Sequence, residues 1–174
     1  DMEGGFFDRL VASPVSRTAI LVGRPRLAEN YGVSVALLFL AVGLVFGARV
    51  EGGLAGVLVL LVLAALLSVA ISGLGVFLAL RSGSAEVVQG TFPLFFALLF
   101  FSSAFFPRET MSGWFKVVAD VNPISYLVEA MRDQVIVGVE ARETLIGLAV
   151  VIGLAALAIA GCWSAFHRRL RGPL

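Results

Sequence analysis

The sequence is poor in charged residues and in the residue types that form disulfides or bind metals. Charged residues make up 14% of the 174 residues, where soluble chains carry about 25%. Cys162 and His167 are the only cysteine and histidine, which excludes a disulfide scaffold and offers no metal-ligand pattern. A net charge of +1 provides no basic surface for nucleic acid. No phosphate-binding G-x-x-x-x-G-K-[ST] motif occurs, so we expect no ATP hydrolysis by this chain.

Hydrophobic residues, in contrast, make up 59% of the chain, against about 45–50% in soluble proteins. Such a chain cannot cover its surface with polar groups, which predicts an all-α integral membrane protein. Four long stretches without charge are the predicted transmembrane spans, at residues 30–48, 52–80, 87–107 and 144–166. As a single helix the second stretch exceeds the roughly 30 Å of hydrocarbon. It should therefore tilt, or break near Gly73 and Gly75.

The distribution of basic residues predicts the orientation of these spans. Four spans place both chain ends on one side, and that side carries eight of the 13 lysines and arginines. Because basic loops stay in the cytoplasm, we expect both ends to be cytoplasmic.

Residues 108–142 separate the third and fourth spans and predict an external helical hairpin. A short amphipathic stretch begins at Trp114, and Asn122-Pro123 is typical of an N-cap followed by proline at the first helical position. The second helix should end at Gly138. The hairpin could be re-entrant or interfacial, or it could be an amphipathic loop lying on the bilayer.

Charged residues in the second hairpin helix have two interpretations. Glu129, Arg132 and Asp133 could form an acid–base set, but solvated charges fit their spacing better. We therefore expect Glu129 to pair with Arg132 or Asp133 along the helix.

Residues 3–16 form a second non-spanning segment. Phe6 and Leu10 lie on one apolar helical face, and Ser13-Pro14 is a stop signal. This amphipathic helix could rest on lipid or dock into a groove of another protein.

Two stretches resemble the permeases of type-2 ABC exporters, especially the daunorubicin-resistance-like drug exporters. The run Glu3-Gly4-Gly5-Phe6-Phe7-Asp8-Arg9-Leu10-Val11-Ala12-Ser13-Pro14-Val15-Ser16-Arg17 is similar to the cytoplasmic loop before their third span. The runs at residues 100–107 and 118–132, with Trp114 between them, resemble their fifth span and external hairpin. A complete permease of this kind has six spans, so the resemblance implies that this sequence begins just before the third and is N-terminally incomplete.

The resemblance implies a mechanism and a set of partners. A separate ABC ATP-binding subunit would bind ATP and Mg, and its cleft would hold residues 3–16 as a coupling helix. The residues expected to contact it are Glu3, Gly5, Phe6, Arg9, Leu10, Ser13 and Pro14. Trp114, Asp120, Asn122 and Pro123 would belong to the external hairpin, with Asn122 and Pro123 fixing its turn. The permease would work as a dimer in the bacterial cell membrane and move a hydrophobic or amphipathic substrate out of the cytoplasm.

An aromatic stripe in the third span is the candidate substrate path. Phe92, Phe95, Phe96 and Phe100 share one helical face with Phe106, and Phe101 and Phe105 lie opposite. Helix packing and lipid contact are alternative uses of such a stripe, and Pro93 should kink the span.

Two functions of other classes remain open. A membrane-embedded enzyme would need polar groups that converge at one depth, and the spans offer few of them. A non-transporting scaffold, or the remnant of a permease, fits the apolar spans but leaves the resemblance of residues 3–17 unexplained.

Overall fold

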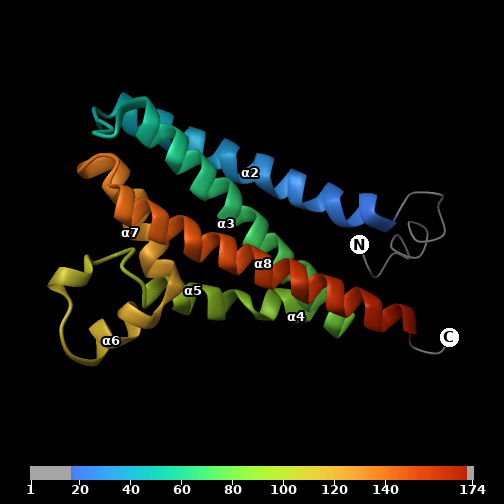
Figure 1. The fold of residues 1–174 in the computed structure, drawn as a ribbon. Coiled ribbons are helices and arrows are strands. Elements are labelled where there is room, and N and C mark those ends of the chain that lie inside the picture. Colours follow the sequence, from blue (N-terminus) through green and yellow to red (C-terminus); the bar gives the residue numbers. More distant parts are fainter. Residues whose placement is uncertain (1–16, 172–174) are drawn as a thin grey trace.

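The computed structural model describes residues 17–171, with the side chains of residues 29–84 and 86–166. Within these residues the fold is all-helical, without strands (Figure 1). The predicted coupling segment, residues 3–16, lies outside them.

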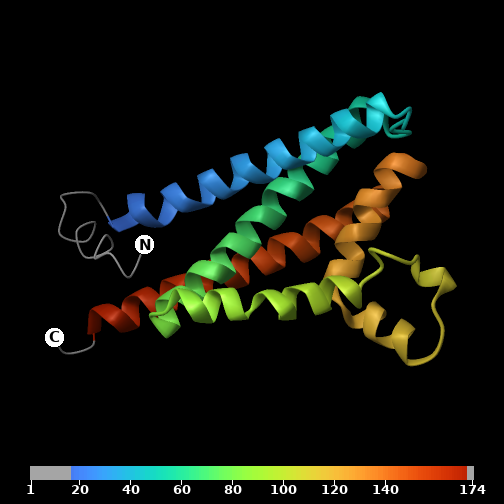
Figure 2. The ribbon, with the colours of Figure 1, turned by 180° about the vertical axis from the view of Figure 1, so that it is seen from behind.

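Three long helices form the bundle: α2 (Arg17–Val45), α3 (Gly53–Ser82) and α8 (Ala141–Arg171). Helix α3 lies between α2 and α8 and packs against both (Figures 1 and 2). The start of α2 and the end of α8 lie at one end of the bundle. Residues 46–52 and 137–140 lie at the other, which we call the loop end.

Helix α3 is continuous, so the predicted break at Gly73 and Gly75 is wrong. At 30 residues it rises about 45 Å. Gly73 serves packing, because a Cβ at this position would lie 3.0 Å from the Cβ of Ala158 on α8. Its carbonyl also accepts a hydrogen bond from the Cys162 thiol of α8, with the two atoms 3.0 Å apart. The glycine thus brings two helices together instead of interrupting one.

The stretch predicted as the third span contains two short helices, α4 (Ala85–Gly90) and α5 (Phe92–Phe100). Ser84 caps α4 by accepting a 3.1 Å hydrogen bond from the Glu86 N–H. The helices are interrupted at Thr91, and Pro93 follows in the first turn of α5, consistent with the kink predicted there. Proline is tolerated in a first turn because the N–H it lacks would have no helical partner.

Helix α5 ends at Phe100, seven residues before the predicted end of the third span. The last carbonyls of a helix need partners from outside the helix. Leu99 O accepts the Ser102 hydroxyl at 2.6 Å, and Leu98 O accepts the Asn122 side-chain amide at 2.7 Å. Phe101, Phe105 and Phe106 therefore lie outside the helix, so the helical positions predicted for them are wrong.

The chain then continues through a segment, residues 101–112, that we call the strap. It contains one turn of 3-10 helix, η1 (Arg108–Thr110), and leads into α6 (Gly113–Val121). The angular yellow path beside α6 in Figure 1 is this segment.

Helix α7 (Pro123–Ile136) begins as its sequence predicts. Asn122 Oδ1 accepts a 3.0 Å hydrogen bond from the Ile124 N–H, and Pro123 occupies the first turn. Gly138, at φ +115°, follows the helix, and its N–H bonds Asp133 O at 2.7 Å. The predicted N-cap and the predicted stop are both confirmed.

The hydrophobic core lies where α7 meets α3 and α8. Leu127 and Ala130 of α7 are buried with Leu63 of α3 and Val151 of α8. Gly147 permits this approach, because a Cβ there would lie 2.4 Å from the Cβ of Ala130. Helix α7 is thus part of the bundle packing.

Two backbone hydrogen bonds join α7 to the α2–α3 connection at the loop end. The N–H groups of Glu51 and Gly52 donate to Val135 O at 3.1 Å and Gln134 O at 3.0 Å. They satisfy carbonyls in the last turn of α7.

Candidate functional site: an apolar groove and a polar strap junction

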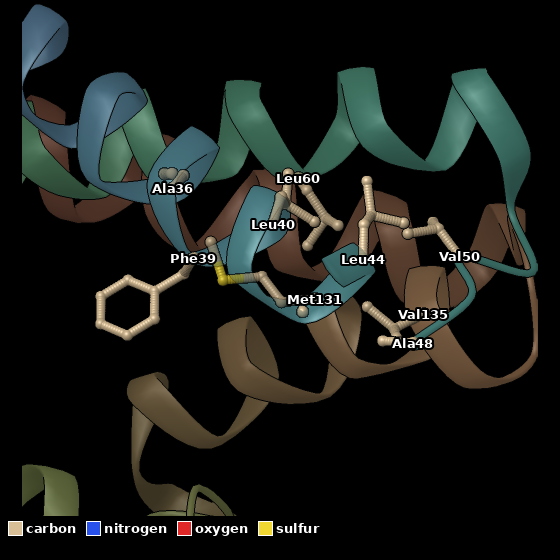
Figure 3. Close-up of a pocket in the computed structure, with 11 residues that line it drawn as sticks. Ala36, Phe39, Leu40, Leu44, Ala48, Val50, Leu60, Met131 and Val135 are labelled. Carbon is tan, nitrogen blue, oxygen red and sulfur yellow. The ribbon is translucent and has the colours of Figure 1, made fainter. Parts of the chain in front are cut away.

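An apolar groove runs between α2, α3 and α7 near the loop end of the bundle (Figure 3). Its volume is about 320 Å³, at the lower limit of typical small-molecule sites. In Figure 3 Leu40 and Leu44 of α2 lie beside Leu60 of α3, and Met131 of α7 extends toward α2. The residues that line the groove are Ala36, Phe39, Leu40, Gly43, Leu44, Ala48, Val50, Leu60, Ala64, Met131 and Val135.

The lining of the groove carries no charged or polar side chain. Binding there would follow from the burial of apolar surface, worth about 25 cal/mol per Å². Met131 adds adaptability, since the thioether side chain fills irregular spaces with little strain. The groove can therefore hold a hydrophobic body.

The predicted aromatic path lies elsewhere. Phe92, Phe96 and Phe100 of α5 are 70%, 55% and 47% exposed, and Phe95 is half-buried. None of them lines the groove. Helix α5 buries none of its residues in this chain, so its aromatic side chains are open to lipid or to another polypeptide. Their role as a substrate path stays a prediction.

Two clusters of polar contacts attach the strap to α7. In the first, Ser103 and Ser125 are fully buried and bond each other twice. The Ser103 N–H donates to Ser125 Oγ at 3.2 Å, and Ser103 Oγ donates to Ser125 O at 3.0 Å. Arg132, one turn further along α7 than Glu129, donates to Ser103 O at 2.5 Å.

The second cluster centres on Arg108 of η1. Its guanidinium makes a two-pronged contact with both carboxylate oxygens of Glu129 and lies 4.4 Å from the centre of the Tyr126 ring. The Asp120 carboxylate is 3.7 Å away, and the Tyr126 hydroxyl donates to Asp120 O at 2.6 Å. The hydrogen bond with Glu129 raises the pKa of Arg108 above its usual range. Arg108 is therefore a permanent cation held against an acid and a ring.

This arrangement corrects the predicted pairing of Glu129. Its partner is Arg108, 21 residues earlier in the chain, whereas Arg132 bonds the strap backbone. No periodicity or motif in the sequence identifies Arg108 as the partner of Glu129, because Arg108 lies in the strap, outside the long helices. The same holds for the Ser103–Ser125 pair, which lies 22 residues apart.

The predicted hairpin residues lie on both sides of this junction. Asp120 faces Arg108, and Asn122 and Pro123 form the turn between α6 and α7. Trp114 is 69% exposed at the start of α6, where its ring stacks edge-on against Phe115.

A buried amide links α7 to α8. Gln134 is fully buried, and its Nε2 donates to Thr144 Oγ1 at 2.9 Å. Beside it, burial and then the nearby Glu143 and Glu140 raise the pKa of Asp133. Among the residues that the structure describes, no group of acids, histidines and cysteines could hold a metal ion.

Comparison with known proteins gives consistent matches. Residues 1–136 match the family model described as "ABC-2 type transporter". Over 137 residues the chain is 33% identical to the daunorubicin resistance ABC transporter permease protein DrrB1 of Streptomyces coeruleorubidus, covering 76% of this chain and 47% of that protein. It is 29% identical to a probable doxorubicin resistance ABC transporter permease protein DrrC of Mycobacterium tuberculosis, covering 74% of this chain and 46% of that protein. It is 25% identical to the putative transport permease ycf38 of Porphyra purpurea, covering 76% of this chain and 46% of that protein.

The chain spans about half the length of these curated relatives. No solved structure matches it. In the described part of the chain, Gly53–Ser82 and Ala141–Phe166 are long and apolar enough to cross a bilayer. The helices and the similarities together support a multi-pass membrane protein.

Proposed function

Because the chain belongs to the ABC-2 type transporter family, we propose that it forms the membrane-spanning part of a permease subunit in an ATP-driven ABC exporter. The observation that carries the proposal is the family match over residues 1–136. The matched range contains residues 3–17, whose resemblance to a coupling loop is part of the proposal. A separate ATP-binding subunit would supply the energy, and a second copy of the permease would complete the transporter.

The proposed topology has four spans, with both ends of this segment in the cytoplasm. The spans are α2, α3, the α4–α5 pair and α8, and the strap, α6 and α7 are external. The excess of basic residues near the two ends of the segment supports this orientation.

We propose a hydrophobic or amphipathic substrate. The apolar groove supports this class, since a lining without polar groups favours an apolar body. The resistance to daunorubicin and doxorubicin in the names of two relatives is consistent with it.

The coupling segment provides the first test of this function. Phe6→Ala and Arg9→Glu should abolish co-purification with the ATP-binding subunit, because they remove a proposed anchor and reverse a proposed contact charge. Phe106→Ala and Arg49→Glu make the same changes at exposed sites outside the coupling segment and should have no effect. Membrane insertion is measured in parallel by protease protection. Unchanged co-purification of Phe6→Ala and Arg9→Glu, with all variants inserted, would contradict the proposed coupling and favour a scaffold.

The groove provides the second test. Ala64→Trp places a large ring in the groove and should lower export while leaving the ATP-binding subunit attached. The matched control is Leu157→Trp, at a 73% exposed position on α8 outside the groove. Equal export by both variants would exclude the groove from the substrate path.

A further inference from the structure

The strap is attached to α7 by polar groups, while its rings contact the flanking helices: Phe101 lies against Trp114 and Phe115 of α6, and Phe105 lies against Phe100 of α5. Between its two polar clusters, Phe105 and Phe106 are 55% and 57% exposed and contribute little apolar burial. Only at its far end does an apolar side chain, Met111, become buried. Loss of the Arg108 contact would therefore remove one of the two polar clusters that join this segment to α7.

The partners of Arg108 are held independently of it. Glu129 and Tyr126 lie on α7, on either side of the buried Leu127, which is fixed in the core. The Tyr126 hydroxyl is held by Asp120 O. Removal of Arg108 would leave this acid and this ring in place, because the hydrophobic core positions them.

Together these groups have the chemistry of an organic-cation site. A carboxylate that accepts two parallel N–H bonds recognises a guanidinium, and an aromatic face within about 6 Å adds cation–π attraction. Arg108 satisfies both conditions in this structure. The side chains of Arg108 and Glu129 are 20% and 18% exposed, so the site is shielded yet open to exchange.

We propose that Glu129 and Tyr126 form an exchangeable site for an organic cation, that Arg108 fills this site while the strap is closed, and that an entering cation displaces Arg108 and releases the strap. Binding itself requires neither a partner nor transport. Its use in releasing a cationic substrate rests on the proposed export function.

The binding test uses N-ethylguanidinium, an analogue of the arginine head group, with the full native chain in lipid nanodiscs. In Arg108→Ala the site is vacant, so the ligand should raise thermal stability saturably. Its half-saturating concentration should be at least about tenfold below that of the wild type, where the ligand competes with a tethered guanidinium. The double variant Arg108→Ala/Glu129→Gln should show no saturable stabilisation.

Matched controls separate specific binding from salt effects. Sodium chloride tests ionic strength, and N-ethylurea is a neutral molecule of similar shape. If Arg108→Ala fails to fold by circular dichroism, Arg108→Gln replaces it. The proposed site would be overturned if the wild type and Arg108→Ala bound N-ethylguanidinium with equal affinity. Saturable binding by Arg108→Ala/Glu129→Gln would also overturn it.

Release of the strap is measured at Met111, which is 8% exposed. Met111→Cys in a Cys162→Ala background should react slowly with a water-soluble maleimide. N-ethylguanidinium should accelerate the reaction, and Arg108→Ala should make it fast without ligand. An unchanged reaction rate in both cases would refute the proposed release of the strap. Neither the binding test nor the maleimide test needs ATP or an ATP-binding subunit. Their results can therefore be interpreted even if the proposed export function is refuted.

Discussion

Asn122 joins the ends of two helices, so its substitution should destabilise the protein in two separable ways. Its Oδ1 caps α7 at Ile124 N, and its Nδ2 bonds Leu98 O near the end of α5. Loss of an N-cap costs about 1 kcal/mol. A helix–helix hydrogen bond in a membrane protein contributes about 0.6–1.7 kcal/mol.

Two variants resolve these contributions. Asn122→Ala removes both bonds and should lower the free energy of unfolding by about 1.5–3 kcal/mol. Asn122→Ser keeps an oxygen for the cap but lacks the amide donor, so it should cost about 0.6–1.7 kcal/mol. Ser112→Ala is the control, because Ser112 precedes α6 without a side-chain capping bond.

The assay is reversible unfolding in mixed detergent micelles, followed by far-ultraviolet circular dichroism. The expected order of stability is wild type and Ser112→Ala, then Asn122→Ser, then Asn122→Ala. Equal stabilities of Asn122→Ser and Asn122→Ala would refute the capping contribution. A cost for Ser112→Ala as large as that for Asn122→Ala would refute the assignment to specific bonds.

Further predictions concern packing and charge. Gly147→Ala should destabilise the protein by about 1–3 kcal/mol through collision with Ala130. Gly153→Ala, which meets no neighbouring atom, should be neutral or stabilise by up to about 1 kcal/mol, so equal effects would contradict the packing argument. Because the pKa of Asp133 is raised in the folded state, the folded protein keeps the carboxyl proton to a higher pH than the unfolded chain does. The free energy of unfolding should therefore fall as the pH rises above 3.8, the ordinary pKa of this carboxyl group. Asp133→Asn should flatten that dependence and stabilise the protein at neutral pH, and an unchanged pH profile would contradict this assignment.

The features predicted correctly from the sequence depend on neighbouring residues. Asn122 followed by Pro123 defines a helix start through contacts within three positions. Gly138 ends the same helix by adopting a positive φ that other residues rarely adopt. Membrane helices are likewise predicted from the apolar composition of a local stretch, because this composition does not depend on distant residues.

The predictions that failed depend on distant residues. At the end of α5, the carbonyl of Leu98 accepts its hydrogen bond from the side-chain amide of Asn122, 24 residues later in the chain. Glu129 bonds Arg108 across the strap, although Arg132 is its neighbour along the helix. Gly73 lies within a continuous α3, where Ala158 of another helix packs against it. Spacing along one helix cannot reveal such contacts.

The central claim is that this chain belongs to a permease driven by a separate ATP-binding subunit. Its most direct test is to isolate the tagged native gene product from its own membranes in mild detergent and to identify every co-purifying chain. The account predicts an ABC ATP-binding subunit whose association is lost in Phe6→Ala and Arg9→Glu. Recovery of correctly inserted protein without such a subunit would contradict the account.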